Sequence, residues 1–194
     1  MGTVTSPSGH ELYPLATVEQ GAVIGDDTMI WHGAHVRSTA RIGARCVIGK
    51  DVYVDAGVVI GDGVKVQNGV SIYYGVVIEA DVFIGPHVTF TNDVAPRAFG
   101  EWAPQPTRVR RGASIGANAT ILCGLTIGEY AMVAAGAVVT HSVQPYALMR
   151  GNPARLVGYV CKRGHSTTQI GPATYLCNAC AARLDIRADW IGNA

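Results

Sequence analysis

The chain has 194 residues, a formal net charge of +1 and a hydrophobic fraction of 48%, which suffices for one domain with a small appendage. It has no basic block of the kind that binds nucleic acid, and no uninterrupted apolar stretch approaches the ~20 residues of a membrane span. The N-terminus lacks a charged-then-apolar signal pattern, and five cysteines, an odd number, fit a reducing compartment better than a disulfide framework. We therefore expect a cytoplasmic protein.

A six-residue period dominates the sequence. A small or β-branched residue stands two positions before each member of an aliphatic row. This period fits neither a helix nor a flat strand, but it fits a very short strand followed by a turn. Three units would close one coil of a triangular prism, and the coils must stack because no single coil buries its own row. The pattern predicts an all-β, parallel β-helix built on Ile24, Ile30, Val36, Ile42, Ile48, Val54, Ile60, Val66, Ile72, Ile78, Ile84 and Phe90.

The repeat is interrupted after Phe90 and resumes at Val109, one residue out of phase. The intervening residues, about 91–108, contain three prolines and one glycine, so we predict that they leave the coil as an extruded loop. A long loop that interrupts an otherwise strict scaffold is usually functional. We therefore expect this loop to belong to the functional site.

Both ends of the repeat can be placed. Leu12 keeps the six-residue phase, so the first coil is expected to begin near residue 10. Pro145 and Pro153 lead us to expect an extended cap over residues 146–155 in place of another coil. The coils, the loop and the cap together assign residues 1–160 to one domain.

The tail, residues 161–194, carries a separate signal. Cys161 and His165 are separated by three residues, and Cys177 and Cys180 by two. Two pairs of soft ligands about a dozen residues apart are typical of a small structural zinc ribbon, which would order a segment too short for its own core. The first pair departs from the usual spacing of two cysteines separated by two residues, so reduced cysteines without a metal are the alternative.

Several segments carry a resemblance to a known family. The coils, the loop and residues 112–155 resemble the left-handed β-helix acyltransferases, and the match covers about residues 8–160. The closer similarity is to the N-acetyltransferases that act on nucleotide-linked 3-amino sugars. It rests on IWHGAHV (30–36), KVQNGVSIY (65–73), DVFIGP (81–86), FTND-x2-PR (90–97) and GNPAR (151–155).

The resemblance implies a left-handed coil and a homotrimer with three active sites, each between neighbouring prisms. It also implies acetyl-CoA as cosubstrate and a UDP- or dTDP-linked amino sugar, acetylated at its C3 amine, as acceptor. The family motif places the residue that orients the amine at Asn92, with Asp93 as a candidate assistant. Arg97 is suited to bidentate contact with a phosphate or a sugar carboxylate. Each of these loop residues also has an ordinary structural alternative, as a turn cap or a surface charge.

Other candidates lie on the coils. Gln67 and Asn68 follow the inward-facing Val66, so one of them should project from a prism face and contact the sugar or its diphosphate; Asn68 could instead only shape a corner. His32 is a candidate sugar contact or a part of the trimer interface. A small-residue stretch that could hold pantetheine and two arginines for the phosphates make up the acetyl-CoA candidates: Ala134, Ala135, Gly136, Arg111 and Arg155.

Two other functions remain open from the sequence. A γ-type carbonic anhydrase resembles residues 30–37 at one place, but its chemistry needs three histidines on a metal, and residues 50–86 contain none. A non-catalytic hexapeptide scaffold would use the loop and the cap only for contacts. Tight binding of acetyl-CoA would separate the transferase from both alternatives.

Overall fold

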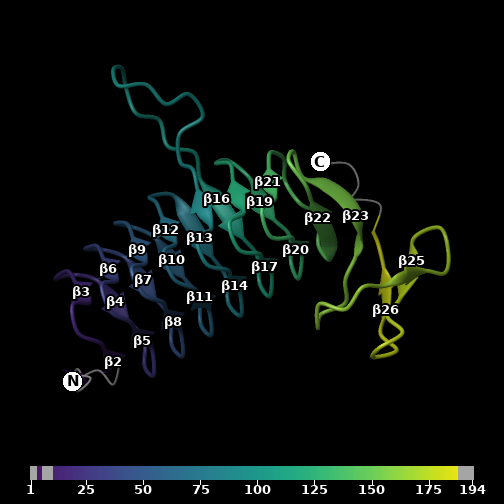
Figure 1. Ribbon diagram of the computed structural model, residues 1–194, viewed down its shortest axis with the longest axis horizontal. Helices are drawn as coiled ribbons and strands as arrows, with labels where there is room; N and C mark the ends of the chain where they lie inside the picture. The colour runs from purple at the N-terminus through teal and green to yellow at the C-terminus, as the bar shows by residue number, and fades with distance from the viewer. Residues whose placement is uncertain (1–3, 6–10, 188–194) are drawn as a thin grey trace.

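The computed structural model describes residues 4–5 and 11–187, and these form short strands stacked into three large sheets, with a small fourth sheet in the tail (Figure 1). Sheet A has ten strands: β1 (Val4–Thr5), β2 (Glu11–Leu12), β5 (Met29–Ile30), β8 (Val47–Ile48), β11 (Lys65–Val66), β14 (Phe83–Ile84), β17 (Ser114–Ile115), β20 (Met132–Val133), β22 (Ala147–Arg150) and β23 (Arg155–Tyr159). Sheet B has seven: β3 (Thr17–Val18), β6 (His35–Val36), β9 (Tyr53–Val54), β12 (Ser71–Ile72), β15 (Thr89–Phe90), β18 (Thr120–Ile121) and β21 (Val138–Val139). Sheet C has six: β4 (Val23–Ile24), β7 (Arg41–Ile42), β10 (Val59–Ile60), β13 (Val76–Ile78), β16 (Thr107–Val109) and β19 (Thr126–Ile127).

Successive strands pass from sheet A to sheet B to sheet C, so each coil contributes one strand to every face of a prism. From β2 to β22 neighbouring strands within a sheet are parallel, and Lys65 pairs with Val47 on one side and Phe83 on the other. This register of 18 residues is three units of six. The stacked coils agree with the expected left-handed β-helix.

The predicted rows form the core. From Ile30 to Val139 every member of the aliphatic row is at most 3% exposed, and the small residues two positions earlier are equally buried from Ala34 to Ala137. At the first coil Ile24 is only partly buried, because fewer coils cover it. The residue between the two inward positions faces outward, as alternation along a strand requires.

The corners of the prism explain the frequent glycine, aspartate and asparagine. The third residue of most corners lies in the left-handed region, with a φ of 57° at Asp51 and 67° at Gly69. This conformation costs little for glycine and is tolerated by aspartate and asparagine. His87 adopts it as well, with a φ of 57°, so its ring is held over the corner of the preceding coil.

The extruded loop is confirmed, with one correction to its end. No strand is assigned between β15 and β16, and β16 starts at Thr107, so the loop covers residues 91–106 and not 91–108. Thr107 is 1% exposed and occupies the small inward position. The sequence pattern missed it because a threonine there looks polar. In Figure 1 the loop projects away from the prism that carries it.

The expected cap after the last repeat was partly wrong. β22 pairs in parallel with β20, so sheet A gains another strand before β23 returns antiparallel to it. Pro145 is compatible with this path because it occupies the second position of a turn closed by the Ala147 N–H and the Gln144 carbonyl, 3.2 Å apart. Proline fits that position, where its missing N–H is not needed.

The tail forms a small antiparallel sheet of β24 (Thr168–Gln169), β25 (Thr174–Leu176) and β26 (Arg183–Asp185). Its apolar residues pack against the end of the coil core, and Ile186 is 6% exposed. The Tyr159 and Tyr175 rings lie 4.7 Å apart. Within the described residues, no helix has the length and apolar character that crossing a membrane requires.

Candidate active site

One edge of the prism brings several of the predicted residues into a single line. The corners between sheets A and B stack through backbone hydrogen bonds, for example from the Gly69 N–H to the Lys50 carbonyl and from the His87 N–H to the Asn68 carbonyl, each 2.9 Å. We call this line the corner column. From the N-terminal end it contains His32, Lys50, Gln67, Asn68, His87, Asn118 and Ala134–Gly136.

The N-terminal part of the corner column is hollowed. A cavity of about 440 Å³ is lined by the predicted residues His32, Gln67 and Asn68 together with Trp31 and Lys50. The sequence analysis did not single out Trp31 or Lys50. The 18-residue register was the missed signal, because it places each of them one or two coils from Gln67 or Asn68 on the same corner.

Aromatic and polar groups meet at this hollow. The Trp31 indole stacks on Tyr13 with a centroid distance of 4.7 Å and an interplanar angle of 4°. Asn68 is exposed, and its Oδ1 accepts a hydrogen bond from the Lys50 backbone N–H at 3.0 Å. Asn68 therefore does shape the corner, and its amide NH₂ group retains donor capacity for a ligand. Gly69, not Asn68, adopts the left-handed conformation.

The C-terminal part of the corner column has only small side chains or none. Ala135 and Gly136 are exposed, and Gly116 in the coil below lies directly beneath Ala135. A Cβ on Gly116 would overlap the backbone nitrogen of Ala135, so glycine is required there. The result is a narrow strip of accessible backbone, which we call the small-residue track (Gly116–Ala117 and Ala134–Gly136).

The loop residues leave from the opposite edge of sheet B. At the loop base the Asn92 carbonyl accepts from the Gln105 N–H at 3.0 Å, and Thr91 Oγ1 accepts from the Cys123 N–H at 2.9 Å. Asp93 Oδ1 accepts from the Ala95 N–H at 2.9 Å, a local turn. Asn92 is half-buried at this anchored base.

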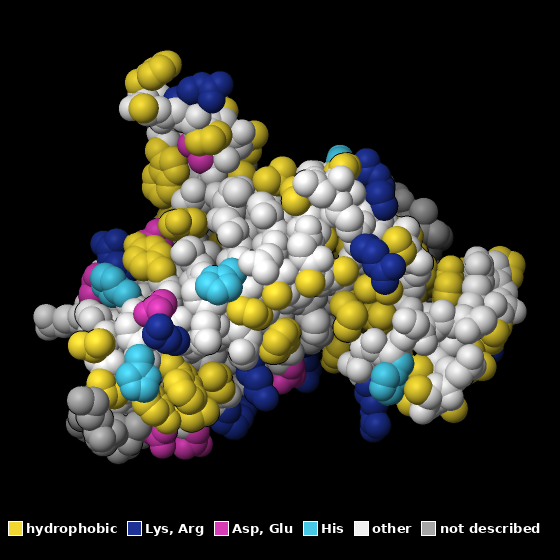
Figure 2. Space-filling model, viewed as in Figure 1, with side chains coloured by type: hydrophobic (Ala, Val, Ile, Leu, Met, Phe, Trp, Pro, Cys, Tyr) yellow, Lys and Arg dark blue, Asp and Glu magenta, His cyan; other side chains and the backbone are white. Residues whose placement is uncertain are grey.

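The rest of the loop is strongly exposed. Phe99 is 81% exposed, Val94 and Trp102 are also exposed, and Arg97 donates to the carbonyl of its neighbour Pro96 at 2.8 Å. Figure 2 shows several hydrophobic side chains and one basic side chain on this projection. Neither Asn92 nor Arg97 is among the described residues that line the hollow with Gln67 and Asn68.

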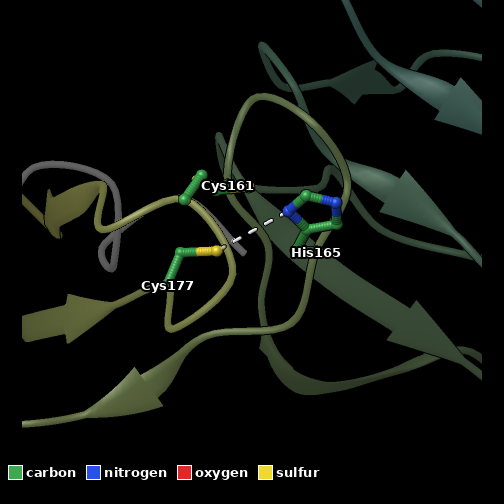
Figure 3. A group of neighbouring side chains, drawn as sticks. Cys161, His165 and Cys177 are labelled. Atoms are coloured by element: carbon green, nitrogen blue, oxygen red, sulfur yellow. Dashed lines mark hydrogen bonds between the residues drawn. The ribbon is translucent and has the colours of Figure 1, made fainter.

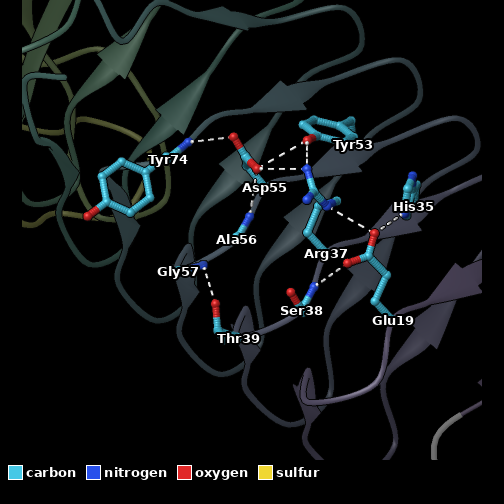
Figure 4. A network of polar contacts seen from close by, with 10 residues as sticks. All are labelled: Glu19, His35, Arg37, Ser38, Thr39, Tyr53, Asp55, Ala56, Gly57 and Tyr74. Atoms are coloured by element: carbon cyan, nitrogen blue, oxygen red, sulfur yellow. Dashed lines mark hydrogen bonds and ion pairs between the residues drawn. The ribbon is translucent and has the colours of Figure 1, made fainter. Parts of the chain in front are cut away.

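On the N-terminal side of the loop, the edge between sheets B and C carries a polar network (Figure 4). Glu19 accepts from the Ser38 N–H at 2.9 Å and from His35 Nε2 at 2.8 Å, and it pairs with Arg37 Nε at 2.9 Å. These contacts, the Ser38 N–H first, lower the pKa of Glu19 from 4.5 to about 2, against a smaller opposing effect of burial. Arg37 also donates to the Tyr53 hydroxyl at 3.1 Å. The network links the corners of successive coils on the N-terminal side of the loop.

The two arginines predicted to bind phosphates lie elsewhere. Arg111 forms an ion pair with Asp81, 3.1 Å between Nη2 and Oδ2, on the edge between sheets C and A. Sheet A therefore separates it from the small-residue track. Arg155 begins β23 and lines a different hollow of about 290 Å³ with His141 and Met149. Their role in holding acetyl-CoA stays a prediction.

In the tail, both pairs of soft ligands converge, and Figure 3 shows three of these side chains, Cys161, His165 and Cys177. Each side chain offers one ligand atom, and all four atoms lie within 4.8 Å of one another. Burial opposes ionisation of the Cys177 thiol, but hydrogen bonds from the Cys180 side chain and backbone and from the Ala179 N–H lower its pKa to about 6. We call this group the tail cluster: Cys161, His165, Cys177 and Cys180.

Comparison with known families and proteins can now be set beside this geometry. Residues 21–56, 57–92 and 106–141 match the family described as bacterial transferase hexapeptide (six repeats), and residues 39–74 match the hexapeptide repeat of succinyl-transferase. Over 67 residues, 34% of this chain, the sequence is 57% identical to the dTDP-3-amino-3,6-dideoxy-alpha-D-galactopyranose 3-N-acetyltransferase of Aneurinibacillus thermoaerophilus. The aligned segment is 32% of that relative, so the chain spans about a third of its length.

Solved structures agree on the fold. LpxA, a UDP-N-acetylglucosamine acyltransferase from Bacteroides fragilis 9343, superposes with a TM-score of 0.67 over 78% of this chain and 61% of that chain, at 18% identity. The acetyltransferase domain of PglB from Neisseria gonorrhoeae FA1090, in complex with acetyl coenzyme A, gives a TM-score of 0.51 over 77% of this chain and 58% of that chain, at 25% identity. Since the family match covers more than half of the sequence, the chain belongs to the bacterial hexapeptide transferases.

Proposed function

We propose that this protein transfers an acetyl group from acetyl-CoA to the C3 amine of a sugar linked to dTDP or UDP. Two lines of support lead to this reaction. The relative that is 57% identical over 67 residues is named for acetylation of a dTDP-linked 3-amino sugar, and the PglB domain was solved with acetyl coenzyme A. The proposal extends these activities to the present chain.

The observation that carries the proposal is the continuity of the corner column. The small-residue track begins two coils from Asn68 and ends three coils from it, a distance of about 10–14 Å at the usual strand spacing of ~4.8 Å. A pantetheine arm laid along the track would hydrogen-bond to exposed backbone groups and direct its thioester toward the hollow. The hollow supplies what a nucleotide sugar needs: an aromatic surface at Trp31, a cation at Lys50 and amides at Gln67 and Asn68.

The site is completed by a neighbouring chain in our proposal. Asn92 stands on the other edge of sheet B, and its loop projects away from its own prism with Phe99 and Trp102 exposed (Figure 1). Exposed large apolar side chains on a projecting segment usually mark a contact surface. In a closed ring of three chains, each loop would reach the corner column of the next chain, giving three equivalent sites.

The chemistry then requires little from side chains. The amine lone pair attacks the thioester carbonyl carbon, the carbon–sulfur bond breaks, and the departing CoA thiolate takes the proton released by the amine nitrogen. Positioning supplies most of the acceleration in such a reaction. The side-chain carbonyl oxygen of Asn92, Oδ1, would accept a hydrogen bond from the amine. This bond would hold the lone pair of the amine toward the thioester.

A direct test uses the full chain, acetyl-CoA and a panel of dTDP- and UDP-linked sugars with the amine at C3 or C4. Release of free CoA thiol should be fast with the 3-amino sugars and slow with the 4-amino sugars. Calorimetry should show acetyl-CoA binding, and light scattering should show a trimer. A protein that does not bind acetyl-CoA would support the scaffold alternative, and preference for a 4-amino sugar would contradict the C3 assignment.

A further inference from the structure

The tail cluster combines four soft ligands that lie far apart in sequence. Cys161 follows β23, the last strand of sheet A, and His165 lies four residues later. Cys177 and Cys180 lie on the turn between β25 and β26. The fold therefore brings a segment of the coil domain and a turn of the tail sheet to one point.

Two distances within the tail cluster are close to the edges of a tetrahedral zinc site. Zinc–sulfur bonds of about 2.3 Å and zinc–nitrogen bonds of about 2.0–2.1 Å imply sulfur–sulfur edges of about 3.8 Å and sulfur–nitrogen edges of about 3.6 Å. The Sγ atoms of Cys180 and Cys161 are 3.7 Å apart, and Cys177 Sγ lies 3.8 Å from His165 Nδ1. The sulfurs of Cys161 and Cys180 are too far apart for a disulfide bond, which is about 2.05 Å long.

The surroundings also suit a metal. Cys161 is 4% exposed and Cys177 is fully buried, while His165 is exposed at the rim. The backbone N–H groups of Ala179 and Cys180 hydrogen-bond to Cys177 Sγ, and such donors stabilise a metal-bound thiolate. Three thiolates and one imidazole are ligands that zinc favours.

The tail gains little stability from its own packing. Its sheet has three short strands, and its apolar residues are covered by the end of the coil core rather than by one another. So small a sheet is marginal without an added cross-link. A metal held by the tail cluster would connect β23 directly to the turn between β25 and β26.

We propose that the tail cluster binds one zinc ion, which fastens the tail onto the last coil. The site is structural, because four protein ligands leave no open position for chemistry. The ion also sets the position of Lys162 and Arg163, which lie between two of its ligands. Lys162 Nζ stands 5.1 Å from the centre of the Tyr130 ring on the coil domain.

The test begins with elemental analysis of the full chain purified without chelator, which should contain about one zinc per chain. Cys177→Ser should reduce this to a tenth or less. The matched control is Cys46→Ala, which removes another buried thiol at an inward position that alanine fills in the two preceding six-residue units, Ala34 and Ala40; it should keep the zinc. His165→Cys should retain the ion and His165→Ala should lose most of it, which tests the exposed ligand without a buried change.

A second measurement does not depend on any variant. Removal of zinc by chelation should speed trypsin cleavage after Lys162 and Arg163 at least tenfold and leave the coil domain resistant, and added zinc should reverse this. Cobalt in place of zinc should give the visible absorption bands of a tetrahedral thiolate site. Protein without metal, an intact zinc content in Cys177→Ser, or a disulfide within the tail cluster by mass spectrometry would overturn the proposal.

Discussion

The proposed sharing of the active site between chains can be tested with two inactive variants. Asn92→Ala removes the amide on the loop, and Ala135→Glu places a charged side chain on the small-residue track. Ala135 is exposed and does not adopt the left-handed conformation, so Ala135→Glu should fold. Each variant alone should lose about 10²-fold or more of its activity, the scale seen when one orienting hydrogen-bond group is removed.

The expected rescue follows from the geometry. Asn92 and Ala135 lie on opposite edges of sheet B, so a shared site takes its loop from one chain and its track from the next. In a randomly mixed 1:1 trimer, the loop donor must be an Ala135→Glu chain and the track donor an Asn92→Ala chain. Each condition holds for half of the chains, so about a quarter of the sites, and about a quarter of wild-type activity, should return.

The assay is CoA release by the two variants co-expressed with different tags, with native mass spectrometry to verify mixed trimers. As a control, a chain carrying both changes is mixed 1:1 with wild type. Shared sites then retain about a quarter of the activity, whereas sites within one chain retain about half. Mixed trimers of the two single variants that are no more active than either variant alone would refute the shared site.

Three further outcomes are expected. In steady-state kinetics, Asn92→Ala should lower kcat by about 10²–10³-fold without changing the KM for acetyl-CoA. In the same assay His87→Ala should retain at least about a tenth of kcat, because the proposed reaction requires no histidine base. The depressed pKa of Glu19 stabilises the fold above pH 4.5, and this contribution is lost as pH falls toward about 2; Glu19→Gln should flatten acid denaturation curves in that window. Phe90→Ala should lower the free energy of unfolding by about 3–5 kcal/mol, because Phe90 is fully buried. Phe83 is 40% exposed, so Phe83→Ala should lower it by less than half as much; denaturant unfolding at matched protein concentration measures both.

The repeat could be predicted from sequence almost residue by residue. Each coil contacts only its neighbours, so a local period of six also fixes the long-range pairs, such as Lys65 with Val47 and Phe83. The errors arose where one residue can serve two structures. Thr107 looked like part of a loop but fills an inward position, and Pro145 looked like a coil breaker but sits where a turn accepts proline.

The candidate site was less accessible to sequence reasoning, because function depends on which corner of the prism a residue occupies. A residue and its equivalent 18 positions later share a corner, so Trp31 and Lys50 could have been associated with Gln67 and Asn68 from the register alone. The same arithmetic fails for Asn92, since the loop begins on the opposite edge of sheet B. No periodicity within one chain can place that residue in the hollow. In the proposed trimer Asn92 would reach the hollow of a second chain, so its role would depend on the assembly and not on the repeat within one chain.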